Sequence, residues 1–132
     1  MSYVRALKAL VALLDQNLRL LEAHQHLDPS PGVGAIAVRR RRACSSLRAS
    51  LRLRGETVPH LAARGQGLAP AATMNDLRRA ESKLLGSYDA VLGLIDTGAA
   101  ESRLLHDQRA ESEQAYLSFA TRPPLAMPLP RL

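Results

Sequence analysis

Aromatic residues and cysteine are nearly missing from this 132-residue chain. It has one Phe, three Tyr, no Trp and a single cysteine, Cys44. One cysteine excludes an internal disulfide framework and a multi-cysteine zinc site. The scarcity of aromatic and β-branched residues argues against a β-sandwich or a β-barrel. No apolar run is long enough for a membrane span, and no stretch reads as a signal peptide, so we expect a cytoplasmic protein.

Leucine and alanine dominate the chain instead, with 24 and 21 copies, and this composition favours helix. The length fits one domain. Apolar residues recur at steps of three and four between Gly and Pro breaks, which predicts helices near residues 3–27, 33–54, 73–96 and 99–120. We therefore predict an all-α protein. Residues 1–120 would form a single up-down-up-down four-helix bundle, and residues 121–132 an extended Pro-rich tail.

The net charge of +6 is concentrated in one part of the sequence. Residues 31–72 hold eight arginines against Glu56 alone, whereas residues 73–120 carry five positive and eight negative side chains. A basic helix that lies on acidic helices would neutralise much of this charge within the fold. Nucleic acid is disfavoured as a partner because no aromatic side chain accompanies the basic run. We expect no membrane partner, since the basic helix has only a thin apolar face.

Four consecutive arginines form the sharpest local feature, and they are Arg39, Arg40, Arg41 and Arg42. Four successive residues span most of the circumference of a helix, so at least one of them must point towards the core. Arg40 is best placed because it follows Ala37 by three residues and precedes Cys44 by four. Glu81 lies in the apolar seam of the next predicted helix, where a carboxylate needs a partner. These positions predict a buried Arg40–Glu81 ion pair, and an anion-binding patch of all four arginines is the alternative.

Cys44 itself allows two interpretations. A cysteine in a helical seam is usually a small buried hydrophobic residue. Neighbouring arginines would favour the thiolate and make the side chain reactive. The sequence leaves this choice open.

Four short motifs lie within the predicted helices and their exits: Leu14-Asp15, Leu53-Arg54-Gly55-Glu56, Glu81 seven residues before Tyr88, and His106-Asp107. In these motifs the chain resembles the small bacterial ferritin-like four-helix-bundle proteins of unknown function. The resemblance covers about residues 3–120. It implies a ferritin-like bundle with a stress-associated role.

The chain departs from this pattern at the metal ligands. A ferritin-like dimetal site takes a Glu from each of two helices and a Glu-x-x-His from each of two others. This sequence has no Glu-x-x-His, and Ser45 stands where the resemblance would place a Glu in the second helix. Glu22, Glu81 and His106 remain as weak candidate ligands. We therefore expect no cofactor and no catalytic residues.

These observations favour a non-catalytic ferritin-like bundle that acts by binding or assembly. The apolar seams of the second and fourth predicted helices are sparse, and a homodimer would cover them. Two alternatives stay open. One is a metal-binding stress protein or enzyme that uses iron or manganese on the same bundle. The other is a small adaptor or chaperone that binds a protein partner through the Pro-rich tail.

Overall fold

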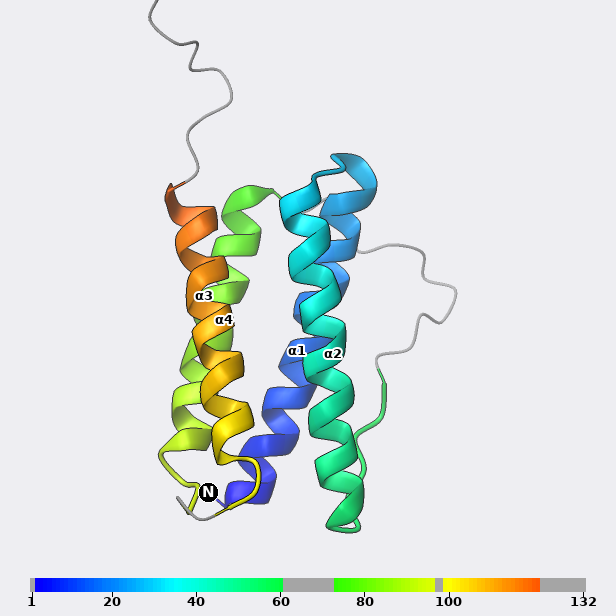
Figure 1. Ribbon diagram of the computed structural model, residues 1–132. Coiled ribbons are helices and arrows are strands. Elements are labelled where there is room, and N and C mark those ends of the chain that lie inside the picture. The colour runs from blue at the N-terminus through cyan, green and yellow to red at the C-terminus, as the bar shows by residue number, and fades with distance from the viewer. Residues whose placement is uncertain (1, 61–72, 97–98, 122–132) are drawn as a thin grey trace, which may run out of the picture.

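The computed structural model describes residues 2–60, 73–96 and 99–121. This part of the chain holds four helices and no strand, which confirms the predicted all-α class (Figure 1). The helices are α1 (Tyr3–Leu27), α2 (Pro31–Leu53), α3 (Met74–Leu92) and α4 (Ser102–Thr121). Residues 122–132, nearly all of the predicted Pro-rich tail, lie outside the described part. None of the four helices is long and apolar enough to cross a membrane.

Local signals in the sequence set the ends of the helices. Ser2 and Ser30 cap α1 and α2 by accepting hydrogen bonds from backbone N–H groups of the first turn. Thr73 and Asp76 form a complete capping box at α3. Gly55 follows α2 with φ at 78°, a backbone conformation that glycine adopts without strain. Pro31 starts α2 two residues before the predicted boundary, because proline is well accommodated in the first turn of a helix.

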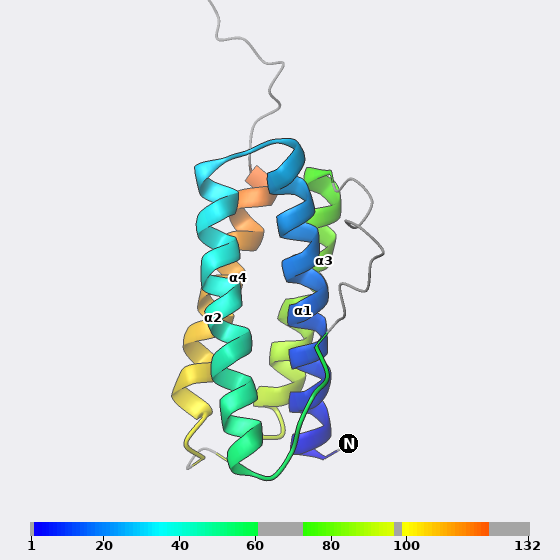
Figure 2. The same ribbon diagram turned by 90° about the vertical axis from the view of Figure 1, so that its right-hand side faces the viewer.

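The order of helix directions differs from the prediction. Tyr3 at the start of α1 donates to Glu101 just before α4, so these two helices begin at the same end of the bundle. Arg40 pairs with Glu81, each within ten residues of the start of its helix, so α2 and α3 begin at the opposite end. Both views show the resulting course as up, down, down and up (Figures 1 and 2). The predicted up-down-up-down order is therefore wrong.

The connection from α2 to α3 explains this arrangement. The 23 residues of α2 rise about 35 Å, and the 20 residues between α2 and α3 are enough to reach further than that. α2 ends at one end of the bundle, and α3 begins at the other end, beside the start of α2. The first residues of the connection turn back along the bundle (Figure 2), where Val58 packs on the core and Arg48 donates to the carbonyl oxygens of Val58 and Pro59.

The helices do not pack equally. α1 lies against α2 and α3, and α3 also lies against α4, whereas α2 and α4 come close at few points. The core is aliphatic, and leucines are its main fully buried residues. It forms two clusters along the bundle axis. The larger cluster includes Leu14 and Leu84, and the smaller one includes Leu21 and Leu77. Polar residues lie between the two clusters.

Candidate functional site

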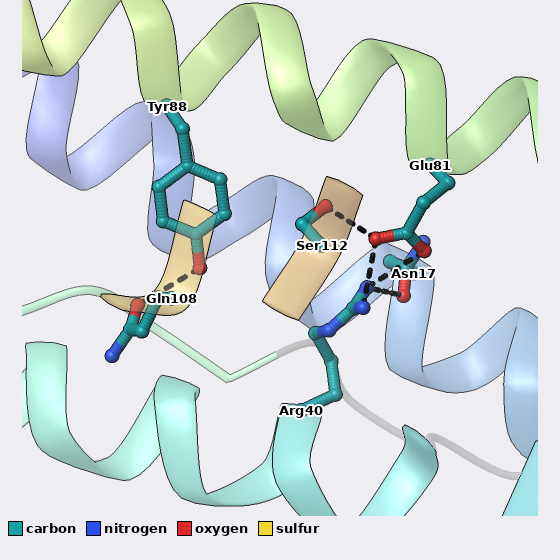
Figure 3. A network of polar contacts seen from close by, with 6 residues as sticks. All are labelled: Asn17, Arg40, Glu81, Tyr88, Gln108 and Ser112. Atoms are coloured by element: carbon teal, nitrogen blue, oxygen red, sulfur yellow. Dashed lines mark hydrogen bonds and ion pairs between the residues drawn. The ribbon is translucent and has the colours of Figure 1, made fainter. Parts of the chain in front are cut away.

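Each helix contributes one buried polar residue at the level that divides the core. Asn17, Arg40, Glu81 and Ser112 come from α1, α2, α3 and α4 in that order, and we call them the buried polar layer (Figure 3). On each helix the layer lies between residues of the two apolar clusters, such as Leu14 and Leu21 on α1. The same seam that buries leucines thus carries these polar side chains into the interior.

The predicted ion pair between Arg40 and Glu81 is present at the centre of this layer. Nη1 of Arg40 lies 3.1 Å from Oε1 of Glu81, and Nη2 lies 2.8 Å from Oε2. Glu81 is fully buried and Arg40 is 5% exposed. Ser112 also donates to Oε2 of Glu81, and Arg40 donates to Oδ1 of Asn17. The carboxylate is therefore neutralised by a two-pronged guanidinium and further hydrogen-bonded by a hydroxyl.

The layer leaves one hydrogen-bonding group unused. Oδ1 of Asn17 accepts from Arg40, but Nδ2 of the same amide is buried and has no partner. A buried donor without a partner costs about 1–3 kcal/mol.

Two turns along α3 from Glu81, Tyr88 donates a hydrogen bond to Oε1 of Gln108 at 2.8 Å. Burial raises the pKa of Tyr88 above its usual value, so the hydroxyl keeps its proton.

A second buried ion pair lies nearer the end of the bundle, between Arg48 of α2 and Asp15 of α1. The distances are 3.1 Å from Nη1 to Oδ1 and 2.6 Å from Nη2 to Oδ2. Hydrogen bonding to Asp15 raises the pKa of Arg48, which keeps the guanidinium charged. Sγ of Cys44 lies 3.5 Å from the same carboxylate. Burial, reinforced by the charge of Asp15, raises the pKa of Cys44 to about 12, so the structure favours the inert, buried interpretation of this thiol.

A third polar cluster joins the ends of α1, α2 and α4. Glu101 accepts from Arg54 at 2.7 Å and from Tyr3 at 2.8 Å. The guanidinium of Arg54 also lies 5.2 Å from the centre of the Tyr3 ring. Burial pushes the pKa of Glu101 upward, but the hydrogen bonds from Arg54 and Tyr3 outweigh it and the pKa is lowered. This cluster ties the end of α2 to the start of α4.

The candidate metal ligands do not meet. Glu22 lies on the surface and pairs with Arg41 at 2.7 Å, Glu81 belongs to the buried polar layer, and His106 is exposed on α4. Within the described residues no three His, Cys, Asp or Glu side chains are grouped so that they can hold a metal ion. The layer offers one carboxylate, which a guanidinium already occupies. These residues do not fit the dimetal site of a ferritin-like protein.

The four consecutive arginines do not form one surface. Arg40 points into the core, and Arg41 is turned towards Glu22 of α1. Arg39 and Arg42 are exposed on α2. The predicted four-residue anion patch is thus divided, because successive residues on a helix point in directions about 100° apart.

The Asp15–Arg48 pair was not predicted from the sequence, although the spacing of residues on α1 and α2 indicates it. Arg40, Cys44 and Arg48 are spaced by four residues, which places all three on one face of α2. Asp15 follows the buried Val11 by four residues in the same way on α1. The cluster around Glu101 has no comparable signal, since the relative placement of helix ends depends on the order of helix directions.

Comparisons with protein-family models, with curated proteins and with solved structures find no match for this chain. Function is therefore inferred from the residues and their geometry. The buried polar layer and the charges on the helix surfaces are the features that carry this inference.

Proposed function

We propose that the protein is a non-catalytic, ferritin-like helical bundle that acts by binding or assembly, with the stress-associated role that its resemblance implies. The observation that carries this proposal is the Arg40–Glu81 pair. In a metal-binding bundle of this kind, cations neutralise the inward carboxylates. Here a guanidinium takes that place, and a second guanidinium neutralises Asp15.

The surface that supports assembly is the side of the bundle formed by α2 and α4, which faces the viewer in Figure 1. The central charges of this side differ between the two helices, and Arg103 adds one positive charge near the start of α4. Arg39 and Arg42 are exposed on α2, and Asp107 and Glu111 are exposed on α4. We call these four residues the α2–α4 charge face. Arg39 and Glu111 line the same narrow crevice between the helices, so the two kinds of charge lie at similar heights along the bundle.

This charge face is complementary to itself. A two-fold axis parallel to the helices places α2 of one copy opposite α4 of the other, at the same height and running in the opposite direction. Arginines of each copy then face carboxylates of the other on both sides of the axis. We propose a homodimer through this face. Electrostatic pairing of this kind fixes the register of the partners and weakens as salt is added.

The test is the solution mass of the protein, measured by size-exclusion chromatography with light scattering. We expect a dimer at low salt and dissociation as the salt concentration rises. Arg39→Glu and Glu111→Arg should each give a monomer, because each change sets like charges against one another in the dimer. Mixing the two variants should restore a dimer, since the carboxylate introduced in one chain then faces the guanidinium introduced in the other.

Arg52→Glu is the matched control, because Arg52 is an exposed arginine of α2 outside the charge face. It should remain dimeric. A wild-type protein that stays monomeric at every concentration would refute the homodimer. So would two variants that fail to associate when mixed.

A further inference from the structure

The opposite side of the bundle has a groove between α1 and α3 with a volume of about 350 Å³. This volume lies within the range of small-molecule sites. The residues that matter here are Leu13, Asn17 and Leu20 of α1 and Arg79, Ala80 and Lys83 of α3. We call this feature the α1–α3 groove. The small side chain of Ala80 contributes to the space between the helices.

The groove reaches down to the buried polar layer through Asn17. This side chain is 3% exposed, and its Nδ2 is the buried donor that has no partner. Oδ1 already accepts from Arg40, so Nδ2 is the atom of this amide that still needs a partner. A ligand that brings an acceptor oxygen to this point would satisfy the donor.

The rim of the groove has a net positive charge on the α3 side, where Asp76, Arg79 and Lys83 line it. Arg79 and Lys83 are four residues apart and exposed, so they are neighbours on the surface of the helix. Arg79 shares its charge with Asp76 at 2.8 Å, whereas Lys83 has no ion pair among the described residues. One positive charge of the rim is therefore left over, and it favours an anion.

The walls on the α1 side are apolar. Leu13 and Leu20 lie about one turn to either side of Asn17, on the same flank of α1. A ligand oxygen that accepts hydrogen bonds from Asn17 and Lys83 would therefore have aliphatic side chains on both sides of it along the groove. We propose that the α1–α3 groove binds a short aliphatic monocarboxylate, with its carboxylate towards Lys83 and Asn17 and its chain along Leu13 or Leu20.

The proposal is independent of the homodimer, because the groove and the α2–α4 charge face lie on opposite sides of the bundle. Either one can fail while the other holds.

The test is a titration of the full chain with hexanoate, followed by amide chemical shifts in ¹H–¹⁵N spectra. We expect saturable shifts confined to α1 around Asn17 and α3 around Lys83, with an affinity of about millimolar, as befits so small a ligand. Hexanol, which has the same chain without the charge, should bind several-fold more weakly.

Substitutions of Lys83 on the rim and of Asn17 at the floor of the groove test where hexanoate binds. Lys83→Met, a change at an exposed position, should weaken hexanoate binding about five-fold. Asn17→Asp keeps the oxygen that accepts from Arg40 but replaces the donor with a negative charge, so it should abolish binding. Arg103→Met, an exposed cation on α4, is the matched control and should leave binding unchanged. Unsaturable shifts, equal binding of hexanol, or an effect of Arg103→Met equal to that of Lys83→Met would overturn the proposal.

Discussion

Arg40 and Glu81 each bring a full charge into an aliphatic core, so each is stable there only while the other is present. Removal of one partner from a buried ion pair strands the other charge and typically costs about 3–5 kcal/mol. Replacement of both by uncharged residues removes that penalty. We therefore expect the pair to add little net stability compared with well-packed uncharged side chains.

This reasoning predicts a double-mutant cycle with a strong coupling. Glu81→Gln and Arg40→Met should each lower the free energy of unfolding by about 3–5 kcal/mol, and the double variant should recover much of that loss. Arg52→Met, which changes an exposed arginine of the same helix outside the α2–α4 charge face, should have almost no effect. Urea unfolding measures all four. Effects that simply add would mean that the two charges do not depend on each other.

Cys44 gives a second prediction at the scale of one residue. Its folded pKa of about 12 lies above the ordinary value of 9.0, so the folded state favours the protonated thiol. This contribution to stability is complete below about pH 9 and is lost as the pH rises towards 12. At pH 8 the native thiol should react with a disulfide reagent far more slowly than in urea. Equal rates in the two states would show that Cys44 is accessible and activated.

Among the four helices, α2 is the one whose sequence predicts most about the interior of the bundle. Residue spacing alone predicts the inward direction of Arg40, because four consecutive arginines cannot all avoid the core. The partner Glu81 follows from its place in the apolar seam of α3. The relative directions of the helices could not be predicted in this way, because hydrophobic periodicity describes each helix separately. The length of the α2–α3 connection was the clue, because it is long enough to reverse the second pair of helices.

Arg48 links α2 to the start of that connection and supplies the third prediction. Its guanidinium binds Asp15 and the carbonyl oxygens of Val58 and Pro59. Arg48→Met should therefore destabilise the protein by several kcal/mol, by stranding the buried Asp15. It should also accelerate amide hydrogen exchange in residues 55–60, which lose their anchor to α2.

Arg52→Met is the control for this change, because Arg52 lies one turn further along α2 and is exposed. It should leave both the unfolding free energy and the exchange rates unchanged. Unchanged exchange in Arg48→Met would mean that other contacts hold the connection against the bundle.

The molecule as a whole is a bundle whose interior charges are balanced by its own side chains. Arginines of α2 reach carboxylates of α1 and α3, and Arg54 reaches Glu101 at the start of α4. This internal neutralisation explains how a chain with a strongly basic second helix packs its core. Because guanidinium groups already neutralise the interior carboxylates, these carboxylates are not available to bind a metal cation.

The most direct test of this account is the melting temperature of the purified protein with a chelator and then with Fe²⁺ or Mn²⁺. A metal present at 100 times its dissociation constant would stabilise the folded state by about 2.7 kcal/mol, which corresponds to a rise of about 10 °C for a chain of this size. We predict the same melting temperature in all three conditions. A rise of several degrees with either metal would show that the folded protein binds cations, and it would contradict the proposal that Arg40 and Arg48 take their place.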